Sequence, residues 1–390
     1  MRTIGVVTVA RSDYGIYLPL LRKIQADADL RLHLIVSGMH LSPEFGLTVK
    51  MIEADGFEIG ERVEMLLSSD RPEGIAKSMG LGVIGFAQAY ARFCPDILVV
   101  LGDRFEMHAA ALAALPFNLP VAHLHGGELT QGAIDDALRH SMTKLSHLHF
   151  VSTQDYGRRV RQLGEEAWRV VVSGALSLDN LRHVHLLNRE ELAKKIGARL
   201  ANEFLLVTYH PVTLEYEQAE WQVGELLAGL DQFGLPVLFT MPNADTGGRL
   251  IKHMTENYVA THPTSHIVDN LGTQAYFSAM ALATAMVGNS SSGIVEAAMF
   301  KLPVVNIGTR QKGRIRSANI VDVDHGRDAI VKGIQQAVGG EFRDTLEQLT
   351  NPYGDGHAAD HIVRVLKQVE LNDRLVIKAF SDTSLSESGG

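Results

Sequence analysis

Residues 97–106 read Ile-Leu-Val-Val-Leu-Gly-Asp-Arg-Phe-Glu, and this stretch decides the fold. Its first five residues are all apolar, which is typical of a parallel strand that is buried on both faces of its sheet. Glycine and charged residues follow at once, and a helical pattern begins at Phe105. Similar apolar runs alternate with amphipathic segments along the whole chain, so the sequence predicts an α/β protein.

Each half of the chain contains its own series of strands that alternate with helices. The first half predicts strands at Thr3–Val9, Leu32–Ser37, Ile97–Leu101, Val121–His125, Leu148–Ser152 and Val170–Ser173. The second predicts strands at Phe204–Tyr209, Pro236–Met241, His266–Val268, Ala285–Gly288 and Pro303–Ile307. We expect two doubly wound domains, at 1–175 and 176–355, a C-terminal helical segment at 356–380 that packs back on the first domain, and a disordered Ser/Gly-rich tail at 381–390.

Composition narrows the class of protein. The 390 residues, 46% of them hydrophobic, suffice for two ordinary cores. A formal net charge of −9 argues against a protein that coats nucleic acid or an anionic membrane. The single cysteine, Cys94, excludes an intrachain disulfide and a multi-cysteine metal site. No apolar stretch approaches the roughly 20 residues that span a bilayer, so we expect a cytoplasmic protein.

Polar residues gather where the predicted strands end, which is where ligands sit in doubly wound sheets. In the second half, Gly288-Asn289-Ser290-Ser291-Ser292-Gly293 precedes a helical pattern at Ile294–Phe300, and hydroxyls at a helix start suit a phosphate group. Glu296 is placed to reach a ribose diol, and Arg310 to neutralise a diphosphate. A serine-rich helix cap, a solvated carboxylate and a surface arginine are the alternatives.

The first half carries acid and base side chains at its strand ends. They are Asp103, Arg104, His123, His125, Glu128, Asp135 and Asp136. The spacing matches no zinc motif, so we expect no metal, and such groups suit proton transfer. His210, fixed by Pro211 at the end of a strand, is a further histidine expected to reach the ligand.

These segments together resemble the hydrolysing UDP-sugar 2-epimerases of sialic and legionaminic acid synthesis. The resemblance is carried by Gly102–Glu106, His123–Glu128 with Ile134–Asp136 and Arg139-His140, His210–Thr213, Gly288–Gly293 with Glu296, and Gly308–Gln311. It runs from about Arg2 to the region of His357. It implies two Rossmann-like domains facing a cleft, the GT-B-type architecture, and a homodimer or homotetramer that needs no cofactor.

The resemblance also implies a reaction and site residues. UDP leaves C1 of a UDP-2-acetamido sugar, and the free sugar is inverted at C2 through a glycal. We expect UDP-N-acetylglucosamine to be the substrate, which gives N-acetylmannosamine and UDP as the products. The implied catalytic residues are Asp103, His125, Glu128, Asp135 and His210, and the implied substrate-binding residues are Arg11, Asp13, Arg104, Asn243, Asp245, Ser290, Ser291, Glu296 and Arg310. The position of His125 is a glutamate in some members, and the base at C2 stays open.

Other interpretations stay open beside this one. A UDP-sugar glycosyltransferase, a non-hydrolysing 2-epimerase and a non-catalytic sugar-nucleotide-binding protein would share the fold. The hydrolysing relatives divide between UDP-N-acetylglucosamine and UDP-2,4-diacetamido-2,4,6-trideoxyglucose, which belongs to the legionaminic acid pathway. No residue of the sequence chooses between these two sugars.

Overall fold

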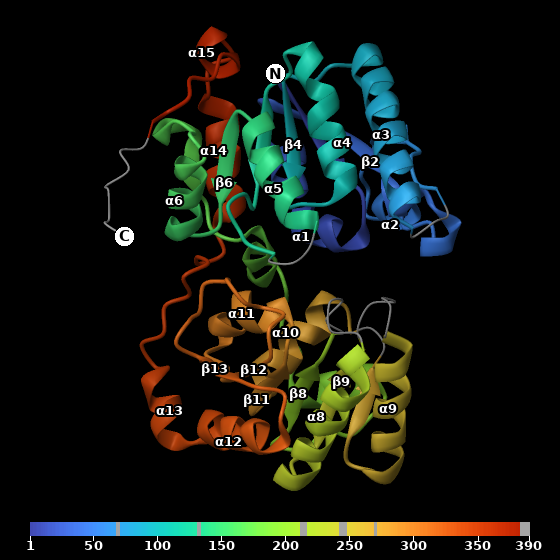
Figure 1. The fold of residues 1–390 in the computed structure, drawn as a ribbon, viewed down its shortest axis with the longest axis vertical. Helices are drawn as coiled ribbons and strands as arrows, with labels where there is room; N and C mark the ends of the chain where they lie inside the picture. Colours follow the sequence, from blue (N-terminus) through green and yellow to red (C-terminus); the bar gives the residue numbers. More distant parts are fainter. Residues whose placement is uncertain (68–70, 131–133, 211–216, 242–247, 269–270, 383–390) are drawn as a thin grey trace. The chain divides into compact units, whose positions relative to one another are not determined.

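The chain forms two compact units, each built on one parallel sheet (Figure 1). The computed structural model describes residues 1–67, 71–130, 134–210, 217–241, 248–268 and 271–382. Unit 1 comprises residues 1–180 and the segment from Tyr353 onward, and unit 2 comprises Leu181–Pro352. The α/β class and the two doubly wound sheets predicted from the sequence are confirmed.

The sheet of unit 1 has the strand order β3-β2-β1-β4-β5-β6-β7, and all its pairings are parallel. Its strands are β1 (Arg2–Thr8), β2 (Leu30–Ser37), β3 (Ile59–Val63), β4 (Ile97–Leu101), β5 (Val121–Leu124), β6 (Leu148–Val151) and β7 (Val170–Val172). Its helices include α1 (Arg11–Ala26), α2 (Val49–Ala54), α3 (Pro72–Arg92), α4 (Phe105–Ala114), α5 (Ile134–Leu145), α6 (Gln154–Gln162), α14 (Ala358–Gln368) and α15 (Asp373–Val376).

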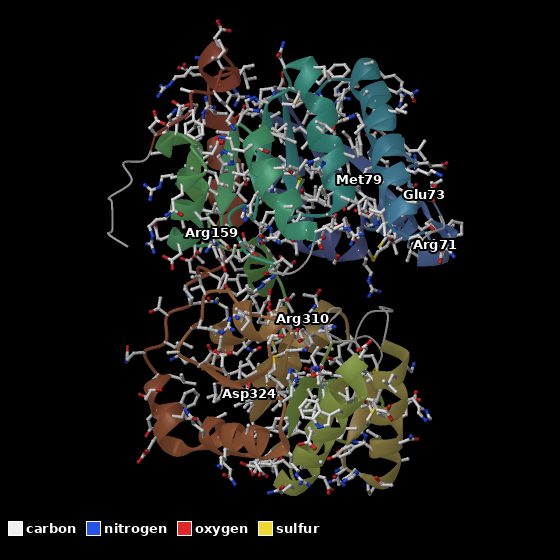
Figure 2. All side chains as sticks on the ribbon, viewed as in Figure 1. Arg71, Glu73, Met79, Arg159, Arg310 and Asp324 are labelled. Atoms are coloured by element: carbon white, nitrogen blue, oxygen red, sulfur yellow. The ribbon has the colours of Figure 1, made fainter. Side chains whose placement is uncertain are left out.

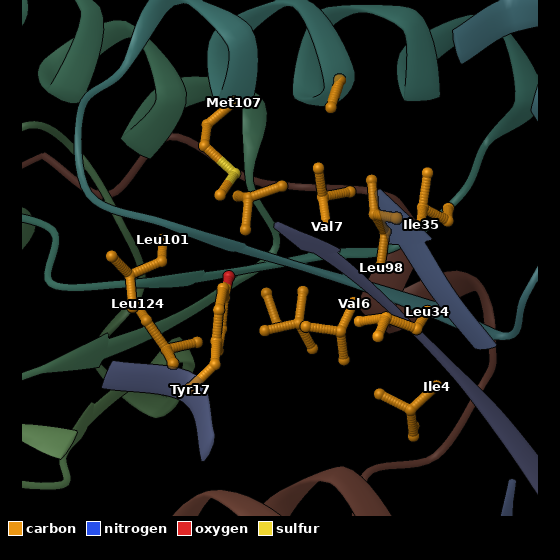
Figure 3. Close-up of a cluster of buried hydrophobic side chains, with 14 of the residues drawn as sticks. Ile4, Val6, Val7, Tyr17, Leu34, Ile35, Leu98, Leu101, Met107 and Leu124 are labelled. Atoms are coloured by element: carbon orange, nitrogen blue, oxygen red, sulfur yellow. The ribbon is translucent and has the colours of Figure 1, made fainter. Parts of the chain in front are cut away.

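Helices cover this sheet because its central strands are apolar on both sides. All five residues of β4 are buried, and α3, α4 and α5 pack side by side as one layer, in front of the sheet in Figure 1. Figure 3 shows Val6 and Val7, consecutive on β1, pointing to opposite sides of the sheet, Val7 near Met107 of α4. The C-terminal helix α14 packs against α1, where Lys23 Nζ lies 2.5 Å from Asp360 Oδ1.

The sheet of unit 2 has the order β10-β9-β8-β11-β12-β13 and is also parallel throughout. Its strands are β8 (Leu205–Thr208), β9 (Val237–Thr240), β10 (His266–Val268), β11 (Ala285–Gly288), β12 (Val304–Ile307) and β13 (Ile320–Val323). Its helices include α7 (Arg189–Ile196), α8 (Ala219–Phe233), α9 (Gly248–Thr261), α10 (Gly272–Leu282), α11 (Ser291–Val295), α12 (Arg327–Val338) and α13 (Gly340–Thr345).

Alternate residues of these strands enter two separate cores. Leu205 and Val207 of β8 belong to one buried cluster, whereas Leu206 belongs to the other. Because successive side chains of a strand point to opposite faces, the sheet has an apolar core on each side. This is why its strands read as unbroken apolar runs in the sequence.

The edge strands β3 and β13 were not predicted from the sequence. β3 reads Ile-Gly-Glu-Arg-Val and is half exposed, so it lacks the continuous apolar run of a central strand. The helix predicted at Ile294–Phe300 is divided between α11 and a 3₁₀ turn at Ala297–Phe300. No helix in the described part of the chain is long and apolar enough to cross a membrane.

Candidate functional site

The turn after β1 is organised by the carboxylate of Asp13. It accepts hydrogen bonds from the backbone N–H groups of Val9 and Ala10 (2.9 and 2.7 Å) and from the Thr8 hydroxyl (2.7 Å). Burial raises the pKa of Asp13 to about 6, against the effect of these hydrogen bonds. The structure therefore places Asp13 as the buried group that holds the start of α1, whereas Arg11 is exposed on the same turn.

Asp103, just after β4, is joined to the loop that precedes α5 by Arg139. The guanidinium of Arg139, which is buried, donates to Asp103 Oδ2 and, over 3.1 Å, to the Thr130 hydroxyl. Thr130 in turn donates to Asp103 Oδ2 over 3.3 Å. The side chain of Asp103 remains 21% exposed, so this carboxylate is held in place but still open to solvent.

His125 and Glu128 form a pair in the loop after β5. His125 Nδ1 lies 3.0 Å from Glu128 Oε1, which also accepts a 3.0 Å hydrogen bond from the Ser152 hydroxyl after β6. Arg139 Nη1 lies 3.6 Å from Glu128 Oε2. One buried arginine thus links Asp103 with the His125–Glu128 pair, and the carboxyl ends of β4, β5 and β6 meet around it.

Two further groups of unit 1 were predicted to act on the ligand. Arg104 makes a two-point contact with the buried Glu106 carboxylate at 2.8 and 3.2 Å. Asp135 begins α5, and burial together with the Asp103 charge raises the pKa of Asp135 above its ordinary value. A carboxyl group with a raised pKa holds its proton to a higher pH than an ordinary aspartic acid does.

In unit 2, Asn289 brings three segments together at the end of the sheet. Its side chain accepts from the His210 backbone N–H (2.7 Å) and donates to the His210 carbonyl (2.8 Å). Its own carbonyl accepts from Arg310 (3.0 Å) and Gln311 (2.8 Å). Burial and the positive charge of Arg310 lower the pKa of His210 to about 4. His210 is therefore neutral at pH 7.

Residues Ser290 to Ser292 follow Asn289 directly in the chain. Ser290 is buried and accepts from the backbone N–H of Ser292 over 3.3 Å, while Ser291 and Glu296 are partly exposed. Gly288 has a φ of 138°, and a Cβ there would lie 2.0 Å from the Thr208 carbonyl oxygen. Only glycine lets β11 pass so close to β8 before the chain turns into the serines. Arg310 is exposed on the turn after β12 (Figure 2).

The predicted residues thus fall into two groups, each within one unit. In unit 1, Asp103, His125 and Glu128 are joined through Arg139; in unit 2, Asn289 joins His210 to Arg310. Asn243 and Asp245 lie outside the described residues. Asn289, Ser152 and the linking role of Arg139 were not predicted, although Asn289 and Arg139 lie inside the quoted motifs.

The chemistry available differs between the groups. Unit 1 offers carboxylates and an imidazole for proton transfer, and unit 2 offers hydroxyls, a guanidinium and a neutral histidine for a bound anion. Among the residues that the structure describes, no three His, Cys, Asp or Glu side chains are grouped to hold a metal ion.

Comparisons with known proteins place the chain among similar sequences and folds. The family model described as UDP-N-acetylglucosamine 2-epimerase matches residues 22–367. The chain is 44% identical, over 82% of its length and 84% of the relative's, to GDP/UDP-N,N'-diacetylbacillosamine 2-epimerase (hydrolyzing) of Campylobacter jejuni. It is 36% identical, over 97% and 99%, to UDP-N,N'-diacetylbacillosamine 2-epimerase (hydrolyzing) of Legionella pneumophila. The structure of UDP-GlcNAc 2-epimerase from Neisseria meningitidis bound to UDP-GlcNAc shares the fold, with a TM-score of 0.80, 16% identity, and 94% and 99% of the chains covered.

Proposed function

Because the chain belongs to the UDP-N-acetylglucosamine 2-epimerase family, we propose that it hydrolyses and epimerises UDP-2,4-diacetamido-2,4,6-trideoxyglucose, which is UDP-N,N'-diacetylbacillosamine. The two relatives named above support this sugar, since both bear its name. UDP-N-acetylglucosamine is the second candidate, and the family description favours it. We also propose that the protein works in the cytoplasm as a homodimer or homotetramer.

The proposed reaction has two balanced steps. In the first, a base removes the C2 proton, the C2–H electron pair becomes the C1–C2 double bond, and the C1–O bond breaks so that UDP leaves with its electron pair. In the second, water adds its oxygen to C1 of the glycal, and a proton returns to C2 from the opposite face. The sum is UDP-sugar plus water giving UDP and the 2-epimer, and no redox cofactor is needed.

The observation that carries this proposal is the set of acid–base groups joined by Arg139. A proton must be taken from C2 and another returned to it, so the reaction needs more than one such group. The geometry supplies a carboxyl group that accepts a hydrogen bond from Arg139, at Asp103, and a carboxyl of raised pKa, at Asp135. Asp103 suits stabilisation of the positive charge that develops at C1, and Asp135 suits the return of a proton.

Unit 2 is assigned to the nucleotide. We assign Arg310, Ser290 and Ser291 to the diphosphate and Glu296 to the ribose. The leaving UDP gains negative charge as the C1–O bond breaks, so a guanidinium in contact with the diphosphate stabilises the transition state more than the bound substrate. Neutral His210 can donate one N–H to the diphosphate without bringing a second positive charge.

The test compares the two sugar nucleotides directly. UDP release is measured with each substrate over a range of concentrations, and the sugar product is identified by NMR. We expect kcat/KM to be at least about tenfold higher for the diacetamido sugar, which is about 1.4 kcal/mol of transition-state binding. A higher kcat/KM for UDP-N-acetylglucosamine would assign the protein to the second candidate, and release of UDP from neither would reject both.

A further inference from the structure

The imidazole of His125 has one nitrogen engaged and the other unpaired. Nδ1 lies 3.0 Å from Glu128 Oε1, whereas Nε2 is buried and has no hydrogen-bond partner among the described residues. The backbone of His125 is held in the left-handed region, with a φ of 63°, and its N–H donates to the Phe150 carbonyl over 2.9 Å. A histidine kept in a strained conformation with one free nitrogen is typical of a group that acts on a ligand.

The loop itself is fixed by the residues that follow. Gly127 has a φ of 77°, and a Cβ there would lie 2.5 Å from the Tyr156 carbonyl oxygen. Only glycine allows the loop to pack against α6 at this point. The backbone between His125 and Glu128 is therefore constrained by the packing of Gly127 on Tyr156.

The contacts that the structure describes for the Glu128 carboxylate include Ser152, His125 and Arg139. Oε1 accepts from the Ser152 hydroxyl and faces His125 Nδ1, and Oε2 lies 3.6 Å from Arg139 Nη1. A neighbouring guanidinium favours the ionised form of a carboxylate, and an ionised carboxylate can only accept hydrogen bonds. Nδ1 of His125 must then carry the proton, which leaves the lone pair on Nε2.

We infer that His125 Nε2 is the base that removes the C2 proton in the proposed reaction, and that Glu128 is a positioning residue that sets the tautomer of His125. The C2–H bond breaks as an Nε2–H bond forms, the C2 electron pair becomes the C1–C2 double bond, and UDP leaves from C1. Glu128 then faces an imidazolium and stabilises its charge. This inference rests on the proposed function and settles the base that the sequence left open.

Asp103 and Asp135 are less suited to this step. The carboxylate of Asp103 already accepts hydrogen bonds from the Arg139 guanidinium and from Thr130, so its Oδ2 atom is engaged. Asp135 is partly buried, and burial together with the Asp103 charge raises its pKa, so Asp135 suits the return of a proton more than its removal. An unpaired imidazole nitrogen whose other nitrogen faces a carboxylate is the stronger candidate for the base.

The test uses four variants of the full chain and a matched control. His125→Gln removes the base, Glu128→Met removes the acceptor, Glu128→Gln keeps an acceptor without the charge, and Ser152→Ala removes one support of Glu128. Ser173→Ala is the control, because Ser173 is a buried serine just after the neighbouring strand β7. The readouts are UDP release, glycal accumulation, and the ¹⁵N signals of the His125 ring, assigned by their loss in His125→Gln.

We expect His125→Gln to lower kcat by about 10²- to 10⁴-fold with no glycal formed, because the first step is blocked. Glu128→Met shifts the ¹⁵N signals toward the Nε2–H tautomer and lowers kcat with little change in KM. Glu128→Gln retains part of the activity, Ser152→Ala loses less than about tenfold, and Ser173→Ala matches the wild type. In the His125→Gln background, Glu128→Met has no further effect, because Glu128 acts through His125.

Other outcomes overturn the inference while leaving the proposed function intact. Glycal accumulation by His125→Gln would place His125 in the second step. Additive losses in the double variant would show that Glu128 acts on the substrate itself. If Glu128→Met does not fold, Glu128→Gln and Ser152→Ala carry the test, and unchanged His125 ¹⁵N signals with unchanged kcat in both would reject the positioning role. Failure of the proposed function is a separate result, in which the wild type forms no UDP and no epimer.

Discussion

Asn289 joins three segments of unit 2 without carrying a charge. Its side-chain amide accepts from the N–H of His210 and donates to the His210 carbonyl. Its backbone carbonyl accepts from Arg310 and Gln311. A fully buried amide with both ends satisfied fixes the ends of β8 and β11 relative to the turn after β12. The positions of His210 and Arg310 therefore both depend on Asn289.

At this scale, replacing Arg310 with alanine should weaken UDP binding before it affects folding. Loss of a charge-assisted contact to a diphosphate costs about 1.5–3 kcal/mol, which is roughly a 10- to 150-fold increase in Kd. Isothermal titration calorimetry with UDP measures the Kd of each variant. Lys312→Ala is the matched control, because it removes the same charge from an exposed position of the same turn. Equal losses in the two variants would mean that only net charge matters.

The sequence shows where functional side chains gather but not which of them touch. The Asp103, His125 and serine segments are visible because each follows an apolar run. The sequence interpretation assigned the anion to Ser290 and Ser291, since hydroxyls are evident donors, and missed Asn289, whose partners are backbone atoms 79 residues away. Likewise, the contact of Arg139 with Asp103 joins residues 36 apart through the sheet order. Such partners become visible only once the topology is known.

Among the elements, neighbouring parallel strands end close together, and the chain must change direction after each of them. Between β8 and β11 this requires Gly288, whose backbone packs on the Thr208 carbonyl. Central strands of this kind were predictable from their apolar runs, because both faces are buried. Two of the edge strands, β3 and β13, are interrupted by exposed charged residues, Arg62 and Asp322, and so give no such signal.

Gly288→Ala should accordingly destabilise unit 2. The Cβ would meet a backbone oxygen that cannot move without breaking the β8–β11 pairing, so we expect a loss of about 2–4 kcal/mol in the free energy of unfolding. Urea denaturation measures it. Gly80→Ala is the control, because Gly80 lies within helix α3 with nothing within 4 Å of its Cβ position, and this change should stabilise by about 0.5–1 kcal/mol. A Gly288→Ala protein as stable as the wild type would refute the steric argument.

At the scale of the molecule, unit 1 combines buried histidines with a returning C-terminal segment. Arg169, fully buried, donates to the carbonyls of Leu375, Arg374 and Ile377. Burial would raise the pKa of the nearby Glu165, but hydrogen bonds from His149, Lys144 and Lys378 lower it to about 2. The segment from Arg374 to Lys378 is thus held against unit 1 by the buried Arg169 and by the ion pair of Lys378 with Glu165.

The free energy of unfolding of unit 1 should decrease at acid pH, because several of its histidines are buried in the neutral form. Burial lowers the pKa of His123 to about 3 and that of His40 and His147 to about 4, from an ordinary value of 6.5. Below about pH 6.5 the unfolded chain binds protons that the folded chain does not. Stability that is fully present above pH 6.5 then falls as the pH drops toward 4, by about 1.4 kcal/mol per pH unit for each histidine.

Thermal unfolding at pH 7.5 and 5.5 measures this effect. We expect a clearly lower Tm at pH 5.5, and a smaller difference between the two pH values in His123→Gln, whose side chain can still hydrogen-bond the Gly102 carbonyl. His183→Gln is the control, since His183 is exposed and should leave the difference unchanged. A Tm that is the same at both pH values would contradict the burial of neutral histidines.

The central claim, hydrolysis with inversion through a glycal, is tested most directly by proton NMR of the purified protein in deuterated buffer. The substrate is UDP-2,4-diacetamido-2,4,6-trideoxyglucose, with UDP-N-acetylglucosamine in a parallel sample. We expect free UDP together with the 2-epimer carrying deuterium at C2, because the proton removed by the base exchanges with solvent before one returns. UDP released with an uninverted sugar, or an epimer that keeps its C2 proton, would contradict it.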